Sequence, residues 1–316
     1  MTVPPDHPVL AVVAPPRLAR FRELLDLGPD DEIGADFTGW SKLVLLTADH
    51  AVLFPRDHTQ VAFLRNEVLA LEAVNQLQIP AVPRVLAVWE DPSVSAHPVV
   101  VLERLPGIPL AGVVEHMTPA TLADLFGELG RLAARWHGLD TALVSTLPHR
   151  AALDELTTLA DELDLDADEA RTAAGALERA RELLPVLVHG DLHEGQLLVD
   201  PEPPHALTGI LDWQTARVDH PFVEFDLGEW GTALWRGHRA DFPELRRRAW
   251  ATYATERGLE DGLAPVFEWF HACGHARRLL GTQAFPVAHA DGVVGTLAEA
   301  RAHVQMALRT LDGSTE

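Results

Sequence analysis

One short stretch of the chain carries residue types and spacings suited to phosphoryl transfer. Residues 189–196 read His-Gly-Asp-Leu-His-Glu-Gly-Gln, and residues 209–213 read Gly-Ile-Leu-Asp-Trp. A loop of the form H-x-D-x-x-x-x-N uses its carboxylate to orient a hydroxyl nucleophile, and its amide holds magnesium together with a second carboxylate downstream. We therefore expect Asp191 to orient the nucleophile and accept its proton, and Gln196 and Asp212 to bind Mg²⁺.

These residues resemble the motifs of the aminoglycoside phosphotransferases, small-molecule kinases related to protein kinases. The usual motif of that family is H-G-D-x-x-x-x-N followed by I-D-[WF]. The resemblance covers most of the chain, from about residue 39, but is specific only over residues 188–228. Gln196 stands at the family's Asn position and offers the same carbonyl oxygen on a stem one methylene longer. The macrolide phosphotransferase branch carries His there, so the resemblance still implies a metal ligand at this position.

The resemblance also implies a fold of the α+β class, a bilobal protein-kinase-like architecture. It places a small antiparallel-sheet lobe that binds nucleotide over residues 1–105. A mainly helical lobe that carries the catalytic and substrate-binding residues follows over residues 106–316.

Apolar patterning predicts the same order of elements in the first lobe: strand, strand, helix, strand, strand. Apolar residues recurring every three to four positions predict a helix over residues 61–77. Segments rich in β-branched residues and Leu predict strands over residues 42–47, 51–54, 85–89 and 99–105.

The second lobe is expected to be mainly helical. Thr118 followed by Pro119 is typical of a helix start, because the hydroxyl caps the helix and Pro suits its first position. The apolar stripe continues to Trp136. Further helices are predicted over residues 151–163, 171–184 and much of 242–311, and a short buried strand over residues 186–188.

The nucleotide side departs from the family pattern. The resemblance implies a cation on the third strand that neutralises the nucleotide phosphates and pairs with a helix Glu, for which Glu67 is suited. Leu53 occupies the position of that cation and cannot do its work. Lys42 and Arg56 are the two candidates to replace it, and Arg56 is favoured because a guanidinium can span two phosphate oxygens.

The resemblance places the purine against main-chain groups at the crossover between the lobes, which includes Glu103 and Leu105. Main-chain contacts leave the choice between ATP and GTP open. The resemblance places the substrate pocket on the large lobe, where Asp226, Glu229 and Trp230 are candidates. The carboxylates would pair with a cationic sugar amine and the indole would support an apolar ring, although Asp226 could instead brace the catalytic loop.

Composition narrows the classes of partner. The chain has 316 residues and a formal charge of −22, which disfavours nucleic acid or an anionic membrane as partner and suits a cationic substrate. Cys273 is its single cysteine, so a disulfide framework is excluded. We find no signal-peptide pattern in residues 1–16 and no uninterrupted apolar run of 18 residues, so we expect a soluble, cytoplasmic protein.

The sequence therefore favours a Mg²⁺-dependent phosphotransferase that moves the γ-phosphoryl group of ATP or GTP to a hydroxyl of a small molecule. The resemblance makes an aminoglycoside or macrolide antibiotic the first candidate substrate, in resistance or antibiotic production. Two alternatives stay open: a metabolic small-molecule kinase, and a pseudokinase that acts as a binding module, as Leu53 would suggest. The alternation of His189, Asp191 and His193 leaves a further alternative, a zinc-dependent hydrolase. The oligomeric state stays open.

Overall fold

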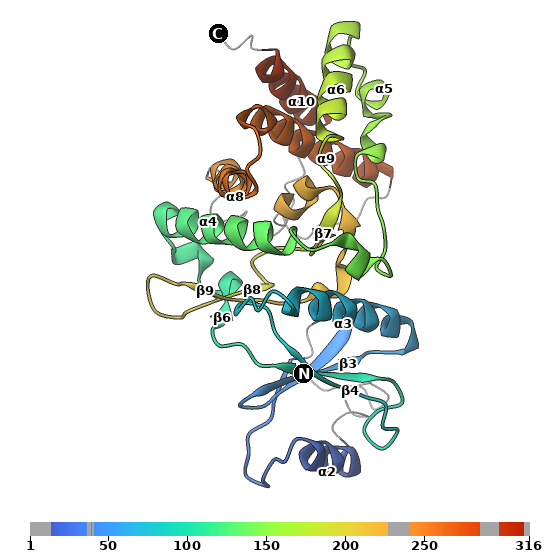
Figure 1. The fold of residues 1–316 in the computed structure, drawn as a ribbon, viewed down its shortest axis with the longest axis vertical. Helices are drawn as coiled ribbons and strands as arrows, with labels where there is room; N and C mark the ends of the chain where they lie inside the picture. Colours follow the sequence, from blue (N-terminus) through green and yellow to red (C-terminus); the bar gives the residue numbers. More distant parts are fainter. Residues whose placement is uncertain (1–13, 37–38, 40, 227–240, 285–296, 313–316) are drawn as a thin grey trace.

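The computed structural model describes residues 14–36, 39, 41–226, 241–284 and 297–312. A sheet-containing lobe lies at one end of its long axis and a larger, mainly helical lobe at the other (Figure 1). The first lobe holds a five-stranded antiparallel sheet with the strand order β1-β2-β3-β5-β4. Its strands are β1 (Gly34–Asp36), β2 (Lys42–Leu46), β3 (His50–Pro55), β4 (Val85–Trp89) and β5 (Val99–Glu103).

Helix α3 (Val61–Asn75) connects β3 to β4, so the predicted order of strand, strand, helix, strand, strand is confirmed. Helix α2 (Pro15–Leu24), which the sequence did not lead us to expect, covers the opposite face of the sheet (Figure 1). Its Phe21 is buried in one cluster with Leu43 and Leu45 of β2. The sheet is therefore enclosed between two helices.

Strand β2 shows the alternation that a sheet covered on both faces requires. Leu43 and Leu45 are buried against α2, whereas Val44 belongs to the cluster that contains Leu64 of α3. Because successive side chains of a strand point to opposite faces, Lys42 lies on the same face as Val44, toward α3.

The helical lobe is built around α4 (Pro119–Trp136), which packs along α8 (Phe242–Arg257). Thr118 caps α4 by accepting a hydrogen bond from the Thr121 amide, as predicted. The two helices approach so closely at Gly130 that a Cβ there would lie 2.1 Å from the Ala249 oxygen. The short strands beside α4 are β6 (Ile108–Pro109), β7 (Val186–Val188), β8 (Leu197–Val199), β9 (Leu207–Ile210) and β10 (Arg217–Asp219).

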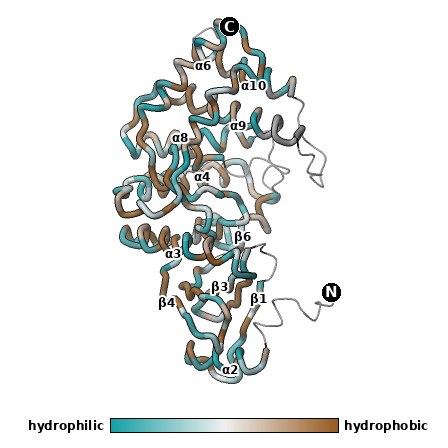
Figure 2. The backbone as a smooth tube through the Cα atoms, turned by 90° about the vertical axis from the view of Figure 1, so that its right-hand side faces the viewer, coloured by the Kyte–Doolittle hydropathy of each residue, from teal (hydrophilic) through white to brown (hydrophobic). Residues whose placement is uncertain are grey.

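Four helices gather at the end of the molecule farthest from the sheet (Figures 1 and 2). They are α5 (Leu159–Glu162), α6 (Ala167–Ala180), α9 (Ala264–Ala284) and α10 (Leu297–Leu311). In Figure 2 hydrophobic and hydrophilic positions alternate along the chain in both lobes, as expected of helices that bury one side. No helix in the described ranges is long and apolar enough to cross a membrane.

Two helix predictions in this lobe were wrong in extent. The predicted helix over residues 151–163 is two short turns, Asp154–Leu156 and α5. Its leucines recur every three to four residues, a spacing that short 3₁₀ turns also satisfy, and the Ala152 amide binds the Asp219 carboxylate instead of continuing a helix. Helix α6 begins four residues before the prediction, because Asp166 and Glu169 form a capping box, and it ends at Ala180.

Candidate active site

The loop after β7 turns sharply at Gly190, which has a φ of +83°. A Cβ there would lie 2.7 Å from the Thr215 oxygen, so this position requires glycine. The turn brings Asp191 to the surface of the loop, where its side chain is exposed.

The ring of His189 holds this loop together. Its Nε2 lies 2.7 Å from the Leu211 oxygen, and its Nδ1 accepts a hydrogen bond of 3.3 Å from the Asp191 amide. Both ring nitrogens are therefore engaged with the main chain, which removes His189 as a zinc ligand. No group of three or more His, Cys, Asp or Glu within the described ranges is placed to hold a metal ion, so the zinc-hydrolase alternative finds no support.

A buried carboxylate anchors the same loop from behind. Glu224 accepts hydrogen bonds from the His189 amide at 3.0 Å, the Trp136 indole at 3.1 Å and His137 Nε2 at 2.9 Å. The Tyr253 hydroxyl lies 3.0 Å from the other ring nitrogen of His137. Burial opposes ionisation of Glu224, but its hydrogen bond to His137 and the nearby imidazoles hold its pKa below the usual value. Glu224, two residues before Asp226, thus braces the loop.

An ion-pair cluster lies on the side of the site nearest the sheet. Lys42 Nζ lies 2.5 Å from Glu67 Oε2 and 2.7 Å from Asp212 Oδ1. The Glu67 side chain is only 1 % exposed. Burial alone would lower the pKa of Lys42, but the two carboxylates raise it above its usual value. The ammonium therefore stays charged and joins β2, α3 and the segment after β9.

The strand register explains why Lys42 reaches Glu67. Leu53 of β3 is paired with Val44, and Lys42 is paired with Pro55, two residues farther along β3. Leu53 is buried in the cluster that contains α3, so Lys42 and Leu53 occupy the same face of the sheet. Arg56 is directed elsewhere, because its Nε donates a hydrogen bond of 2.7 Å to the Gly39 oxygen.

Three polar side chains that the sequence analysis missed connect the two lobes beside Asp212. Asn66 of α3 donates hydrogen bonds of 2.8 Å to the carbonyl oxygens of Gln214 and Ala216. Ser41 donates a buried hydrogen bond of 2.6 Å to Gln214 Oε1. Asp212 itself has a left-handed backbone, with φ 65° and ψ 58°, which is uncommon outside glycine. These contacts hold that turn in place, and no local motif signals them.

Gln196 and Asp212, the expected metal ligands, are adjacent. Gln196 Nε2 lies 3.1 Å from Asp212 Oδ2 and 3.2 Å from His193 Nε2. The Gly195 amide donates a hydrogen bond of 3.0 Å to His193 Nδ1. Asp212 thus binds Lys42 with Oδ1, and its other oxygen, Oδ2, faces the Gln196 amide.

Asp191 lies within the electrostatic field of the same cluster. Although solvent reaches the Asp191 side chain, partial loss of its hydration raises its pKa above the usual value. The Asp212 and Asp226 carboxylates add to this against the opposing influence of His193 and His189. Asp226 thus lies near the catalytic loop. The other two substrate candidates, Glu229 and Trp230, lie outside the described residues.

The crossover between the lobes follows β5. The Glu103 amide donates to the Arg84 oxygen and the Arg104 amide to the Asp49 oxygen, each at 2.9 Å. The Glu103 carboxylate also pairs with Arg84 at 2.9 Å. Leu105 follows Arg104 in the chain, and its main chain forms no hydrogen bond with any residue that the structure describes.

Comparison with known proteins agrees with this geometry. The family model APH, described as "Phosphotransferase enzyme family", matches residues 38–266. A curated mouse protein, "Acyl-CoA dehydrogenase family member 10", is 25 % identical over 194 residues, which are 58 % of this chain but only 18 % of that protein. The chain thus spans less than a fifth of the length of this relative.

Solved structures of similar fold cover nearly the whole chain. The GDP complex of wild-type aminoglycoside 2'-phosphotransferase-IIIa has a TM-score of 0.57 at 14 % identity, over 93 % of this chain and 99 % of that one. Aminoglycoside phosphotransferase APH(2'')-Ib with ADP has a TM-score of 0.58 at 13 % identity, over 94 % and 98 %. Macrolide 2'-phosphotransferase MphH from Brachybacterium faecium has a TM-score of 0.53 at 18 % identity, over 95 % and 99 %. The expected kinase-like fold is thereby confirmed.

Proposed function

Because the chain belongs to the phosphotransferase enzyme family, we propose that it transfers the γ-phosphoryl group of ATP or GTP to a hydroxyl of a small molecule in a Mg²⁺-dependent reaction. The observation that carries this proposal is the cluster of Lys42, Glu67 and Asp212 beside the catalytic loop. The cluster contains a cation, Lys42, that could replace the one missing at Leu53, whose absence was the support for the pseudokinase alternative. The Lys42 ammonium contacts both the helix partner, Glu67, and the expected metal-binding carboxylate, Asp212.

In this proposal Lys42, rather than Arg56, neutralises the nucleotide phosphates. Its side chain projects from β2 onto the face where a cation at Leu53 would lie. Its ammonium is fixed by two carboxylates and needs little reordering when phosphate oxygens approach. Arg56 is held by the Gly39 carbonyl and keeps at most an auxiliary contact.

The hydrogen bonds of His193 support Mg²⁺ binding by Gln196 and Asp212. Because His193 Nδ1 accepts a hydrogen bond from the Gly195 amide, Nε2 is the ring nitrogen placed to donate. A donor at Nε2 is best matched by the carbonyl oxygen of Gln196, so the proposal directs that oxygen, in place of the amide nitrogen, toward His193 and Asp212. The amide oxygen and Asp212 Oδ2 would then converge, which suits a hard cation that needs few protein ligands. Bound Mg²⁺ would offset charge on the phosphates.

Asp191 takes the role of the base in this scheme. It orients the acceptor hydroxyl and receives its proton, while Asp226 contributes negative charge near the same loop. The unused main-chain groups of Leu105 provide a site for the purine at the crossover between the lobes. Purine contacts of this kind accept ATP or GTP.

An aminoglycoside or macrolide is the first candidate substrate, which would make the protein an antibiotic-resistance or antibiotic-production enzyme. Related folds are known in complex with kanamycin, gentamicin and streptomycin. A charge of −22 suits a cationic acceptor. A metabolic kinase for a hydroxylated amine or sugar is the second candidate, because the same charge and catalytic loop serve it equally.

Variants that remove the Lys42 ammonium or move it to β3 test the proposal. The binding of MgATP and MgGTP is measured by calorimetry on the wild type, Lys42→Met/Glu67→Gln and Arg56→Ala. The double change removes the cation without leaving a buried carboxylate unpaired. We expect it to weaken nucleotide binding at least about tenfold, the effect of a lost charged hydrogen bond. Arg56→Ala should change binding by less than about threefold.

A swapped variant, Lys42→Leu/Leu53→Lys, returns the cation to β3 on the same face and should recover part of the affinity. Loss of binding in Arg56→Ala together with full binding in Lys42→Met/Glu67→Gln would overturn the assignment of Lys42. If the wild type bound neither nucleotide, the pseudokinase alternative would be favoured over an active kinase. Mass spectrometry of aminoglycosides and macrolides incubated with MgATP or MgGTP then separates antibiotic from metabolic substrates.

A further inference from the structure

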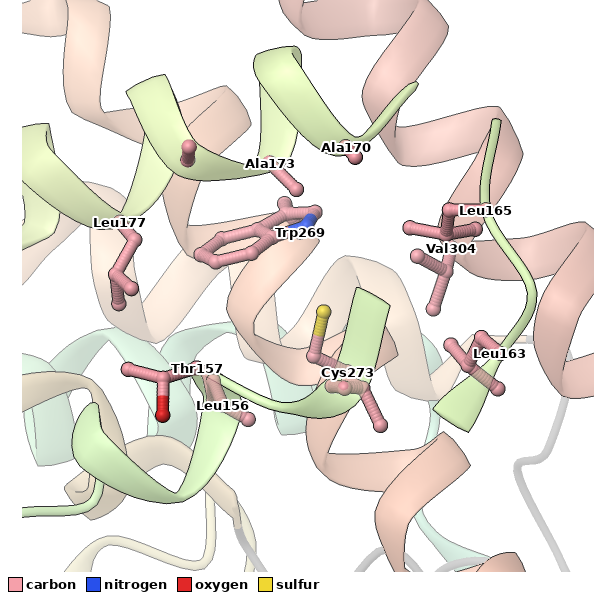
Figure 3. A pocket seen from close by; sticks show the side chains of 12 residues that line it. Leu156, Thr157, Leu163, Leu165, Ala170, Ala173, Leu177, Trp269, Cys273 and Val304 are labelled. Carbon is pink, nitrogen blue, oxygen red and sulfur yellow. The ribbon is translucent and has the colours of Figure 1, made fainter. Parts of the chain in front are cut away.

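The four-helix end of the molecule contains a cavity of about 120 Å³ that the phosphotransfer site does not use (Figure 3). Its walls come from α5, α6, α9, α10 and the segments on either side of α5. They are largely aliphatic: Leu177 lies on one side, and Leu163 and Val304 lie together on the opposite side (Figure 3). An apolar cavity of about 150 Å³ is sufficient to bind benzene. The space is therefore large enough for one small ring.

One buried donor without a partner among the described residues faces this cavity. Trp269 is 3 % exposed, and its Nε1 has no hydrogen-bond partner among the described residues. Figure 3 shows the indole nitrogen directed into the space between Ala170 and Val304. Buried donors are almost always paired, and leaving one unpaired is costly. This unpaired donor on a largely apolar wall thus defines one hydrogen-bonding position for a guest molecule.

We propose that this cavity binds a compact apolar molecule, about one six-membered ring in size, that carries one carbonyl-type oxygen accepting a hydrogen bond from Trp269 Nε1. The aliphatic walls bury the ring, and the oxygen satisfies the indole. An ionised ligand is disfavoured, because the lining residues that the structure describes carry no charge to compensate for its desolvation.

The cavity opens to the surface, and a cysteine in its wall can be used to detect a bound molecule. Thr157 and Ala174 line it and are exposed, so it opens between α6 and the turn before α5. Cys273 lines the inner wall, is 2 % exposed and is the only cysteine of the chain. Burial raises the pKa of its thiol and restricts its access to reagents, so Cys273 should react slowly and through the cavity. A guest should therefore slow its labelling.

Acetophenone and α-methylstyrene make a matched pair of probes, because they differ in shape only by C=O against C=CH₂. Dissociation constants of both are measured on the full chain from the rate at which a maleimide labels Cys273, with Cys273→Ser as the control for background labelling. We expect both probes to slow labelling at millimolar concentration. The affinity ratio of acetophenone to α-methylstyrene should fall about tenfold in Trp269→Phe, which lacks the donor.

Cys273→Leu fills the cavity and serves as a second variant that should stay folded. It should abolish the rise in melting temperature that acetophenone gives to the wild type. Labelling that neither probe slows, up to its solubility limit, would overturn the binding site. An affinity ratio that is unchanged in Trp269→Phe would overturn the hydrogen bond to the indole, and a thermal shift that persists in Cys273→Leu would place the probe elsewhere.

Discussion

The centre between the lobes and the four-helix end bury their groups in opposite ways. Between the lobes, Lys42, Glu67 and Asp212 form a charged cluster, and the buried Glu224 is paired with three donors. In the four-helix end, largely aliphatic side chains surround a cavity, and one buried donor in its wall, Trp269, is unpaired among the described residues.

The difference shows which physical term determines each region. Hydrogen bonds depend on direction, so the paired groups between the lobes hold their partners in a defined geometry, and phosphoryl transfer depends on such positioning. Apolar packing is non-directional and tolerates unfilled volume, so the four-helix end can keep a cavity without losing its fold. Substitutions should therefore act on chemistry in the first region and on volume in the second.

The largest effect is expected for Asp191→Asn. The amide keeps the shape of the side chain but cannot accept the proton of the acceptor hydroxyl, so turnover should fall about 10²- to 10⁴-fold. MgATP affinity and melting temperature should change little, because Asp191 is exposed and contacts neither Lys42 nor Glu67 directly. Steady-state phosphotransfer and calorimetry measure the two quantities. Equal turnover in both proteins would remove Asp191 from the reaction.

Glu224→Leu should cause the largest loss of stability. It leaves the His189 amide, the Trp136 indole and His137 without their acceptor, so the free energy of unfolding should fall by about 3–5 kcal/mol. Urea denaturation measures this loss. Glu155→Leu is the matched control, because its pair with Arg150 is exposed and should contribute less than about 1 kcal/mol. Equal losses in both variants would contradict the bracing role.

Acid should weaken the contact between the two regions through His220. Burial lowers the pKa of His220 to about 4, and its Nε2 lies 3.0 Å from the Ala180 oxygen at the end of α6. The unfolded chain binds a proton near pH 6.5, so it holds more protons than the folded chain between pH 6.5 and 4. Stability therefore falls as the pH falls through this window, by up to about 3 kcal/mol from His220.

Chemical denaturation at pH 7, 6, 5 and 4 measures this slope, and His220→Gln should reduce it. His137 and His189, whose pKa values burial also lowers, should keep part of the slope in that variant. A slope that is the same with and without His220 would show that its protonation is not linked to folding.

The smallest effect is expected for Cys273→Leu. Leu adds apolar volume to the cavity, and it is a good helix former at a position within α9. The free energy of unfolding should rise by about 1 kcal/mol, with phosphotransfer unchanged. Urea denaturation measures the gain, and Ala272→Leu, one residue earlier and not lining the cavity, is its control. A loss of stability confined to Cys273→Leu would mean that the cavity cannot accept a side chain.

The local elements that follow from short-range patterns were largely predicted. The strands of the sheet lobe follow from segments rich in β-branched residues and Leu, α3 follows from apolar residues that recur every three to four positions, and α4 begins at the Thr118 cap. The predicted helix over residues 151–163 failed because its leucine spacing suits short turns as well. Its backbone is drawn into contacts with β10, which lies more than fifty residues away in sequence. Contacts between residues so far apart cannot be recognised from the local sequence.

The sequence by itself indicated the candidate catalytic loop, because Asp191, Gln196 and Asp212 lie in one short segment with the spacing of a phosphotransfer motif. It also showed Leu53 at the position where the resemblance implies a cation. Only the tertiary structure brought Lys42 to Glu67 and Asp212, on which its proposed role rests, since this depends on the pairing of β2 with β3 and on which face meets α3. Ser41, Asn66 and Glu224 became functional candidates for the same reason: each acts on a partner far away in sequence, which only folding brings within hydrogen-bonding distance.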